Sequence, residues 1–340
     1  MKKYIKLLFL SLIIATLSSC NDFLDREPLD QVTPQMYFRS ADDLAAYTIR
    51  DYPFTTVTSA YGINLFGLDN HTDNQAGTGY PTFWQPGQKK VPSAAGSWDW
   101  AKIRNANYFF ENVLPKFEKG EISGNQEHVK HYIGEMYVIR AYNYYQKLVT
   151  YGDFPIVTEV LPDEEEVLIE ASKRSPRYKV ARFILEDLDK ATELLMETPP
   201  NGKNRISKNV AHLLRARVAL FEGTWEKYHK GTAFVPGGPG WKGNSADIAG
   251  YNIDSEIDYF LSEAIKSAKI VGDQIGESLA ENTDTEEGMS PDLQSINPYY
   301  TMFCDENMES YDEVLMWKRF SKQAGVTNTL QMELERNGGG

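Results

Sequence analysis

The sequence predicts a mainly α-helical protein in which helix pairs stack into a tetratricopeptide-like solenoid, with long loops and a few short strands. Apolar residues recur at alternating spacings of three and four in five segments after Gly96, the period of a helix that buries one face. These segments begin near residues 97, 127, 176, 207 and 256, so short and long steps alternate. Because a helix pair cannot bury its apolar face alone, we expect the pairs to stack, with the loops gathered on one side.

The first twenty residues have the layout of a bacterial secretory signal. A basic start precedes an apolar run from Leu7 to Leu17, which is too short to span a membrane. The next residues, Leu17-Ser18-Ser19-Cys20, are typical of a lipobox, in which the cysteine is lipidated and becomes the new N-terminus. We therefore expect residues 1–20 to be a lipoprotein signal peptide and Cys20 to carry a lipid that anchors the remaining chain.

Residues 21–96 are expected to contain an extended entry segment, one helix and a long loop. Ser40 is a suitable N-cap, and Asp42 and Asp43 suit the first turn of a helix that follows it. From residue 52 to residue 96 the helical period is lost, and Gly, Pro, Asn, Thr and aromatic residues dominate. A loop of this length in a compact domain is usually functional or disordered, and its aromatic content argues against disorder.

The later helices carry end signals. The second is expected to end at Tyr151-Gly152-Asp153, with Pro155 just beyond it, and the third at Pro199-Pro200-Asn201-Gly202. Ser207 is the expected N-cap of the fourth, and the fifth is expected from about residue 254 to residue 268.

Short strands are expected at Pro155–Leu161 and Glu313–Lys318. Both lie outside the helical segments.

The composition narrows the choice of partners. The formal net charge of -13 argues against nucleic acid and against electrostatic docking on anionic lipid. The chain has only two cysteines, so lipidation of Cys20 leaves no internal disulfide, and we expect Cys304 to be a small core residue.

Catalytic and metal-binding motifs are poorly represented, and we expect no enzyme activity, no metal and no cofactor. No phosphate-binding loop and no Gly-x-Ser-x-Gly elbow occurs. His128, His131 and Glu135 share one helix face, but a solvated face is favoured over a metal site. The acidic run Asp163–Glu166 indicates solvated surface. The run Asp69–Asn74 is rich in oxygen ligands but lacks the glycine and closing glutamate of a calcium loop.

Two loop regions combine the residue types that bind sugars. Sugar rings present an apolar C–H face and a rim of hydroxyls, so flat aromatic rings and planar polar side chains suit them. The 52–96 loop has both kinds, and a second mixture follows the fourth helix with Trp241, Asn244, Asp247 and Tyr251. The candidate ligand residues are Asp69, Asn70, Asp73, Asn74, Gln75, Tyr80, Trp84 and Trp241.

The tryptophans differ in their expected roles. For Trp84, ligand contact and packing of the loop are equally supported. Trp98, Trp100 and Trp225 border or lie on helices, so packing is favoured for them.

Several blocks of the chain resemble the SusD/RagB family, the surface glycan-binding lipoproteins of Bacteroidetes. The blocks occur in order along residues 20–320: Cys20–Asp25 followed by Pro28, Trp98–Asn107, Arg140–Tyr145, Tyr151–Val157 and Ser207–Arg217. The resemblance implies a tetratricopeptide-like lid on a TonB-dependent outer-membrane transporter of the SusC type. Such a lid captures oligosaccharides at the cell surface and passes them to the transporter without catalysis.

The same resemblance carries two further expectations. The acidic segment with Asp22, Asp25 and Glu27 fits a tag for export of lipoproteins to the outer face. Family members usually run well beyond 340 residues, so residues 21–340 are expected to be the N-terminal helical-repeat domain, with the C-terminal part of the fold missing.

Two alternatives remain beside the glycan-binding interpretation. One is a helical-repeat adaptor at the outer membrane whose loops bind a protein or a peptide. The other is a glycosidase, because carboxylates are plentiful and the sequence does not show which of them are buried together.

Overall fold

The computed structural model describes residues 37–52, 85–88, 98–282 and 297–321, with residues 323 and 325. Its helices confirm the predicted helical fold. None of the helices described is long and apolar enough to cross a membrane. The α-helices are α3 (Ala41–Arg50), α5 (Ala101–Glu118), α6 (Gln126–Tyr151), α7 (Glu165–Ala171), α8 (Arg177–Leu194), α9 (Lys208–His229), α10 (Ile253–Ile275) and α12 (Pro298–Cys304). Single 3₁₀ turns lie at Gly202–Asn204, Ser245–Ile248, Gly276–Ser278 and Met308–Ser310.

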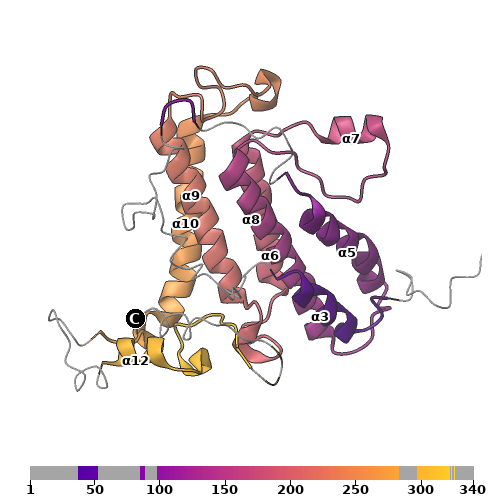
Figure 1. Cartoon of the computed structure of the whole chain (residues 1–340), viewed down its shortest axis with the longest axis vertical. Coiled ribbons are helices and arrows are strands. Elements are labelled where there is room, and N and C mark those ends of the chain that lie inside the picture. The colour runs from indigo at the N-terminus through magenta and orange to yellow at the C-terminus, as the bar shows by residue number, and fades with distance from the viewer. Residues whose placement is uncertain are drawn as a thin grey trace, which may run out of the picture.

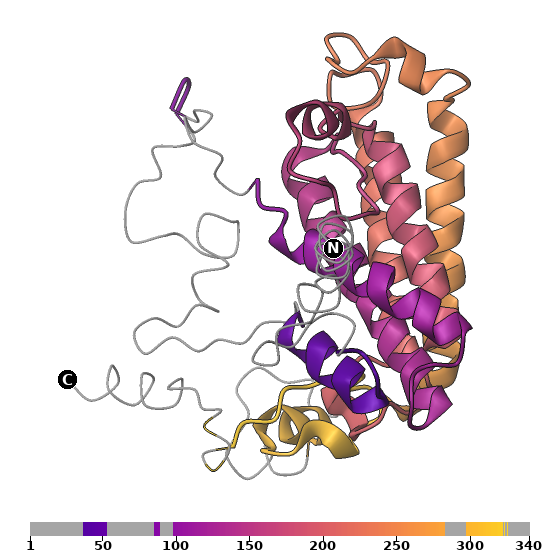
Figure 2. The same ribbon diagram turned by 90° about the vertical axis from the view of Figure 1, so that its right-hand side faces the viewer.

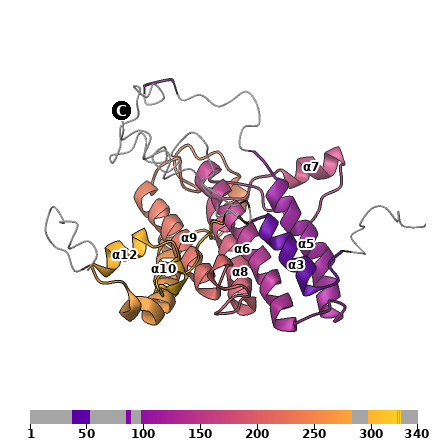
Figure 3. The same ribbon diagram turned by 60° about the horizontal axis from the view of Figure 1, so that its bottom comes forward.

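The long helices form one layered array. Helix α6 packs against α3, α5 and α8, helix α8 packs against α9, and α9 packs against α10. Figures 1 and 2 show α6, α8, α9 and α10 side by side along the long axis of the molecule. Figure 3 shows their order across the array, from α10 through α9, α8 and α6 to α5 and α3. Stacked antiparallel neighbours of this kind bury the apolar faces that single pairs leave open.

Three helix ends follow the predicted local signals, whereas α8 ends at Leu194, before the predicted Pro199–Gly202, and α10 continues past residue 268 to Ile275. Ser40 accepts a hydrogen bond from the backbone N–H of Asp43, whose side chain in turn accepts from the N–H of Ser40, which completes a capping box. Ser207 caps α9 by accepting from the N–H of Val210. Gly152 ends α6 with φ of 70°, a left-handed value that favours glycine.

The two predicted strands are not formed. Residues 155–161 form no strand, and the backbone groups of Val157 and Glu159 bond to side chains of α5 and α6. Asn107 donates to the carbonyl oxygens of Val157 and Glu159, and the Tyr144 hydroxyl both donates to and accepts from the backbone of Val157. At 313–318 the N–H of Trp317 donates to the carbonyl of Lys203. Helical residues thus supply the partners that a neighbouring strand would otherwise provide.

The face of α6 with His131 and Glu135 is buried, so the prediction of a solvated face was wrong. Both side chains are fully buried. Although burial raises the pKa of Glu135, hydrogen bonds from Arg205 and His131 lower it below its usual value. His131 accepts from the N–H of Met196 through Nδ1, so its Nε2 carries the proton that faces Glu135. Within the described residues no three metal-ligating side chains are grouped.

Buried arginines connect the successive helices. Arg140 of α6 binds both carboxylate oxygens of Asp187 on α8, at 2.7 and 2.8 Å, and donates to Asn107 on α5. Arg177 of α8 binds Glu222 of α9 in the same bidentate way. The remaining contacts use Arg205, which binds Glu135 and Thr48, and Arg215, which binds Asp189, Glu263 and Ser267.

Glu226 of α9 is a buried carboxyl that forms no ion pair with any residue in the described part of the chain. The Tyr251 hydroxyl donates to its Oε1 at 3.0 Å, and its Oε2 has no hydrogen-bond partner within the described structure. Burial, and after it the negative charge of Glu222, raise the pKa of Glu226 to about 8. The carboxyl is therefore mostly protonated at neutral pH.

The lone thiol is not in the core. Cys304 is exposed at the end of α12, which corrects the sequence-based prediction. Helix α12 buries only Met302, so a residue two positions later remains at the surface.

Removal of one buried arginine should destabilise the array strongly. We expect Arg140→Met to lower the free energy of unfolding by about 3–5 kcal/mol, because it removes the bidentate partner of the buried Asp187 carboxylate and leaves only Lys190, 3.9 Å away. Lys230→Met, which breaks an exposed ion pair with Asp254, should cost at most about 1 kcal/mol. Urea unfolding followed by circular dichroism measures both; equal losses would contradict this assignment of roles.

The raised pKa of Glu226 predicts a pH dependence of stability. The folded state binds the proton of Glu226 more tightly than the unfolded state does. This carboxyl therefore destabilises the fold increasingly as the pH rises from the pKa of the unfolded chain's carboxyl towards the folded pKa of about 8. Glu226→Gln should therefore raise Tm relative to the unmodified chain more at about pH 8.5 than at about pH 5.5. Glu186→Gln, at an exposed position of α8, controls for the lost charge. The same Tm difference at both pH values would refute a protonated Glu226.

Candidate glycan-binding cavity

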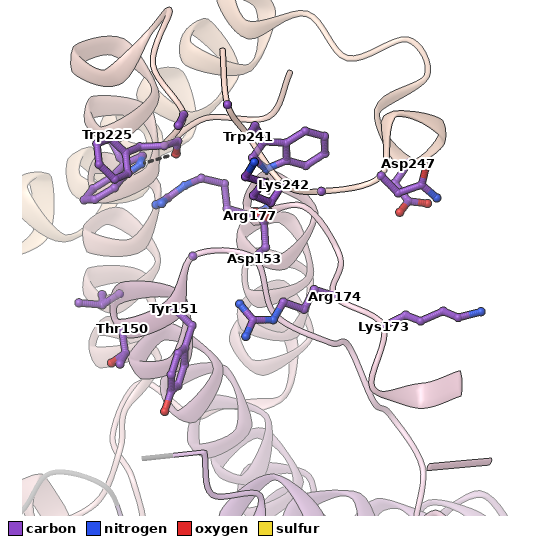
Figure 4. Close-up of a pocket in the computed structure, with 17 residues that line it drawn as sticks. Thr150, Tyr151, Asp153, Lys173, Arg174, Arg177, Trp225, Trp241, Lys242 and Asp247 are labelled. Atoms are coloured by element: carbon purple, nitrogen blue, oxygen red, sulfur yellow. Dashed lines mark hydrogen bonds between the residues drawn. The ribbon is translucent and has the colours of Figure 1, made fainter. Parts of the chain in front are cut away.

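A cavity of about 1020 Å³ lies where three helix ends meet. It is lined by the C-terminal ends of α6 and α9, the segment before and into α8, and the loop between α9 and α10. Figure 1 shows this loop, residues 230–252, above the ends of α9 and α10, and Figure 4 shows the cavity side chains. The solenoid arrangement thus brings loops from different helix pairs to one end.

Three aromatic side chains line the cavity from α9 and the loop that follows it. They are Trp225, Phe234 and Trp241. The Trp225 ring stacks on His229, with 4.1 Å between the ring centroids, and its Nε1 donates to the carbonyl of Phe234. Phe234 is 62% exposed, so the cavity wall includes an apolar surface that is accessible to solvent.

Asp153 fixes the position of Trp241. Its Oδ2 accepts from Trp241 Nε1 at 2.8 Å, and its Oδ1 accepts from the backbone N–H of Arg177 at 2.8 Å. Arg177 is the first residue of α8, whose own N-cap side chain makes no capping bond. A carboxylate at a helix N-terminus is favoured by the unpaired N–H groups and by the helix dipole. Asp153 therefore caps α8 and holds the tryptophan with one side chain.

The 230–252 loop is tied to the helices below it. Tyr251 reaches Glu226 of α9, and its ring lies 4.7 Å from that of Tyr178 of α8. Asn244 caps the short 3₁₀ turn at Ser245–Ile248 by accepting from the N–H of Ala246. Asn244 and Asp247 thereby line the cavity from a turn with fixed local geometry.

Basic side chains also line the cavity, mostly from the segment that leads into α8. Lys173, Arg174 and Arg177 line the cavity there, and Lys242 lines it from the loop. The Arg174 guanidinium lies over the ring of Trp98, 5.0 Å from its centroid. In Figure 4 Arg177 extends towards Trp225, and Arg174 lies on the segment that leads into the same helix, α8.

A second, smaller cavity of about 560 Å³ lies near the start of α5. Trp98, Trp100 and Arg104 line it together with residues of the 157–172 segment. The ring of Trp100 stacks on Phe154 at 4.8 Å, and Trp98 packs on the same phenylalanine. Trp98 and Trp100 therefore pack against the protein as predicted, and they also line a cavity.

The predicted ligand residues fall into two groups. Trp241 lines the larger cavity, as do Asn244 and Asp247 from the same predicted mixture, whereas Tyr251 binds Glu226 instead. Contact of Trp241 with a ligand stays a prediction. The other candidates, together with Cys20, lie outside the described residues: Asp69, Asn70, Asp73, Asn74, Gln75, Tyr80 and Trp84.

Sequence reasoning missed the contribution of Asp153 and of the basic residues 173–177. The block Tyr151–Val157 signalled a helix end and a family likeness, but its acidic residue was not recognised as a cap for another helix. No local pattern marks Lys173, Arg174 and Arg177, because their convergence with Trp241 depends on how α6, α8 and α9 pack.

Comparison with known proteins identifies the family. Residues 22–220 match the model of a SusD-like family described as starch-binding and associating with the outer membrane. Two SusD-like proteins of Formosa agariphila, P2 and P25, are 27% and 24% identical over 69% and 78% of this chain. These matches cover 46% and 52% of the relatives, so the chain spans about half the length of the curated relatives it matches.

A solved structure supports the fold. A SusD-like protein of Bacteroides fragilis, 22% identical, superposes with a TM-score of 0.51 over 76% of this chain and 43% of its own. The family model covers residues 22–220, more than half of the chain. The chain therefore belongs to the SusD-like family.

Proposed function

We propose that this chain is a cell-surface lipoprotein of the outer membrane, anchored through Cys20, that binds oligosaccharides or polysaccharides in the larger cavity. We further propose that it delivers them to a TonB-dependent transporter of the SusC type. Membership of a family described as starch-binding supports a glycan ligand. The lipobox at Leu17–Cys20 supports the lipid anchor.

The lining of the cavity carries the proposal. Trp225, Phe234 and Trp241 offer flat apolar faces, and Asn244 and Asp247 offer planar polar groups within the same space. An aromatic ring suits the C–H face of a sugar, and amide and carboxylate groups suit its hydroxyls. A cavity of about 1020 Å³ at the upper end of the usual range for ligand sites has room for several sugar rings.

The same geometry favours binding over catalysis. A glycosidase places two carboxyl groups on either side of the bond that it cleaves. Of the two carboxylates that line the cavity, Asp153 already accepts from Trp241 and from the N–H of Arg177. Asp153 thus acts as a structural acceptor, and we propose no reaction at this site.

Trp241→Ala should weaken glycan binding without unfolding the chain. We expect a loss of roughly 30-fold, or about 2 kcal/mol, for a glycan retained by the purified mature chain in affinity electrophoresis against plant and host polysaccharides. Trp241→Phe keeps a ring but loses the bond to Asp153, so its loss should be intermediate.

Tyr228→Ala is the matched control, because Tyr228 is a 75% exposed aromatic of α9 that does not line the cavity. Circular dichroism establishes that each variant is folded. Undiminished binding by folded Trp241→Ala would place the glycan site elsewhere in the chain.

Cys20→Ser should release the chain from the membrane. The proposed anchor depends on acylation of this thiol, and each buried CH₂ of an acyl chain contributes about 0.8 kcal/mol. Metabolic labelling with a fatty acid, followed by membrane fractionation, should show both label and membrane association lost in the variant. The Cys304→Ser variant should keep both, and a labelled Cys20→Ser variant would contradict the anchor.

A further inference from the structure

Arg177 is a buried arginine with one donor group left open. Its side chain is 5% exposed, held by Glu222 through Nε and Nη2, with its guanidinium 4.3 Å from the ring centroid of Trp225. Its Nη1 makes no hydrogen bond to any described residue, although Arg177 lines the larger cavity. A β-carbon at position 152 would lie 3.4 Å from this nitrogen, so Gly152 keeps the approach to it open.

Unlike Arg177, two other cations that line the cavity, Arg174 and Lys242, have no carboxylate partner among the described residues. Arg174 contacts the ring of Trp98, and a guanidinium stacked in this way still presents N–H donors at its edge. Lys242 forms no described ion pair, whereas Lys173 pairs with Glu170. A guanidinium edge binds the two oxygens of a carboxylate or sulfate group better than it binds neutral hydroxyls.

The carboxylates in and beside the cavity do not pair with Arg174, Lys242 or the Nη1 group of Arg177 in the described structure. Both oxygens of Asp153 accept from neutral N–H groups, and Glu222 is occupied by Arg177. The lining thus contains Lys173, Arg174, Arg177 and Lys242 against Asp153 and Asp247. Because Lys173 and Arg177 pair with Glu170 and Glu222, the lining cations without a described carboxylate partner are Arg174 and Lys242, in a chain of formal net charge -13.

We infer that the larger cavity binds an anionic saccharide, in which a carboxylate or sulfate group contacts Arg174, Lys242 and the open Nη1 of Arg177 beside the Trp241 ring. The inference rests on the proposed glycan-binding function and names the chemical class of the ligand. Because the chain as a whole is acidic, its overall field repels polyanions, so a preference for them requires a local basic site.

The test compares saccharides that differ only in charge. We would measure binding of the mature chain to oligogalacturonate and its methyl ester, and to dextran sulfate and dextran, in about 50 mM and about 500 mM NaCl. We expect at least about tenfold tighter binding of the anionic member in one pair or both at low salt, reduced at high salt. The pair that shows the preference distinguishes carboxylate from sulfate.

The variant Arg174→Gln/Lys242→Gln should bring this ratio close to one. The control Lys266→Gln/Lys269→Gln removes the same charge from exposed positions of α10 and should keep the preference. Arg177 is left intact, because its loss would also break the buried pair with Glu222.

Two outcomes separate the inference from the proposed function. Equal binding of the charged and neutral members, lost in Trp241→Ala, would overturn the anionic preference and leave glycan binding in the cavity intact. Binding of no saccharide by the folded chain, including those of the wider polysaccharide panel, would overturn the proposed function and the inference with it.

Discussion

The pairing of buried arginines with carboxylates across helix interfaces is the constraint on which the structure depends. Arg140, Arg177, Arg205 and Arg215 each reach from one element to the next, and each guanidinium is at least nine-tenths buried. A planar guanidinium donates two parallel hydrogen bonds to one carboxylate only over a narrow range of positions. Apolar faces tolerate sliding, whereas these pairs fit one rotation and one register of each helix. Desolvation offsets much of their attraction, so we interpret them as selecting the arrangement more than adding net stability.

The same kind of pair positions the candidate site. Arg177 belongs to the α8–α9 interface through Glu222, and it also lies in the wall of the larger cavity. Asp153 at the end of α6 caps α8 and holds Trp241 of the following loop. The contacts that fix α6, α8 and α9 relative to one another therefore also fix the aromatic and basic walls of the cavity. A site built in this way is preorganised, which lowers the cost of ordering side chains on binding.

The loop over the cavity is attached by polar contacts of a different kind. Tyr251 bonds to Glu226, a carboxyl that stays mostly neutral because burial and the nearby Glu222 disfavour its charge. Arg177 pairs with Glu222, so α9 presents one arginine-paired carboxyl and one mostly neutral carboxyl a single turn apart. This arrangement buries two acidic residues side by side without the repulsion of two negative charges.

The sequence alone determined the features that depend on neighbours within a few residues. Ser40, Ser207 and Gly152 set helix ends through bonds or dihedral angles within one turn, and the apolar period predicted the five long helices and their order, though not the short helices α7 and α12. The tertiary structure alone decided which polar residues are buried and which distant residues meet. His131 and Glu135 look like a polar helix start, yet Arg205 lies 70 residues beyond Glu135 and encloses it. Asp153 and Trp241 are 88 residues apart in sequence and hydrogen-bonded in space. Local patterns report the energy of one turn or one helix face, whereas a cavity depends on the packing of several helices at once.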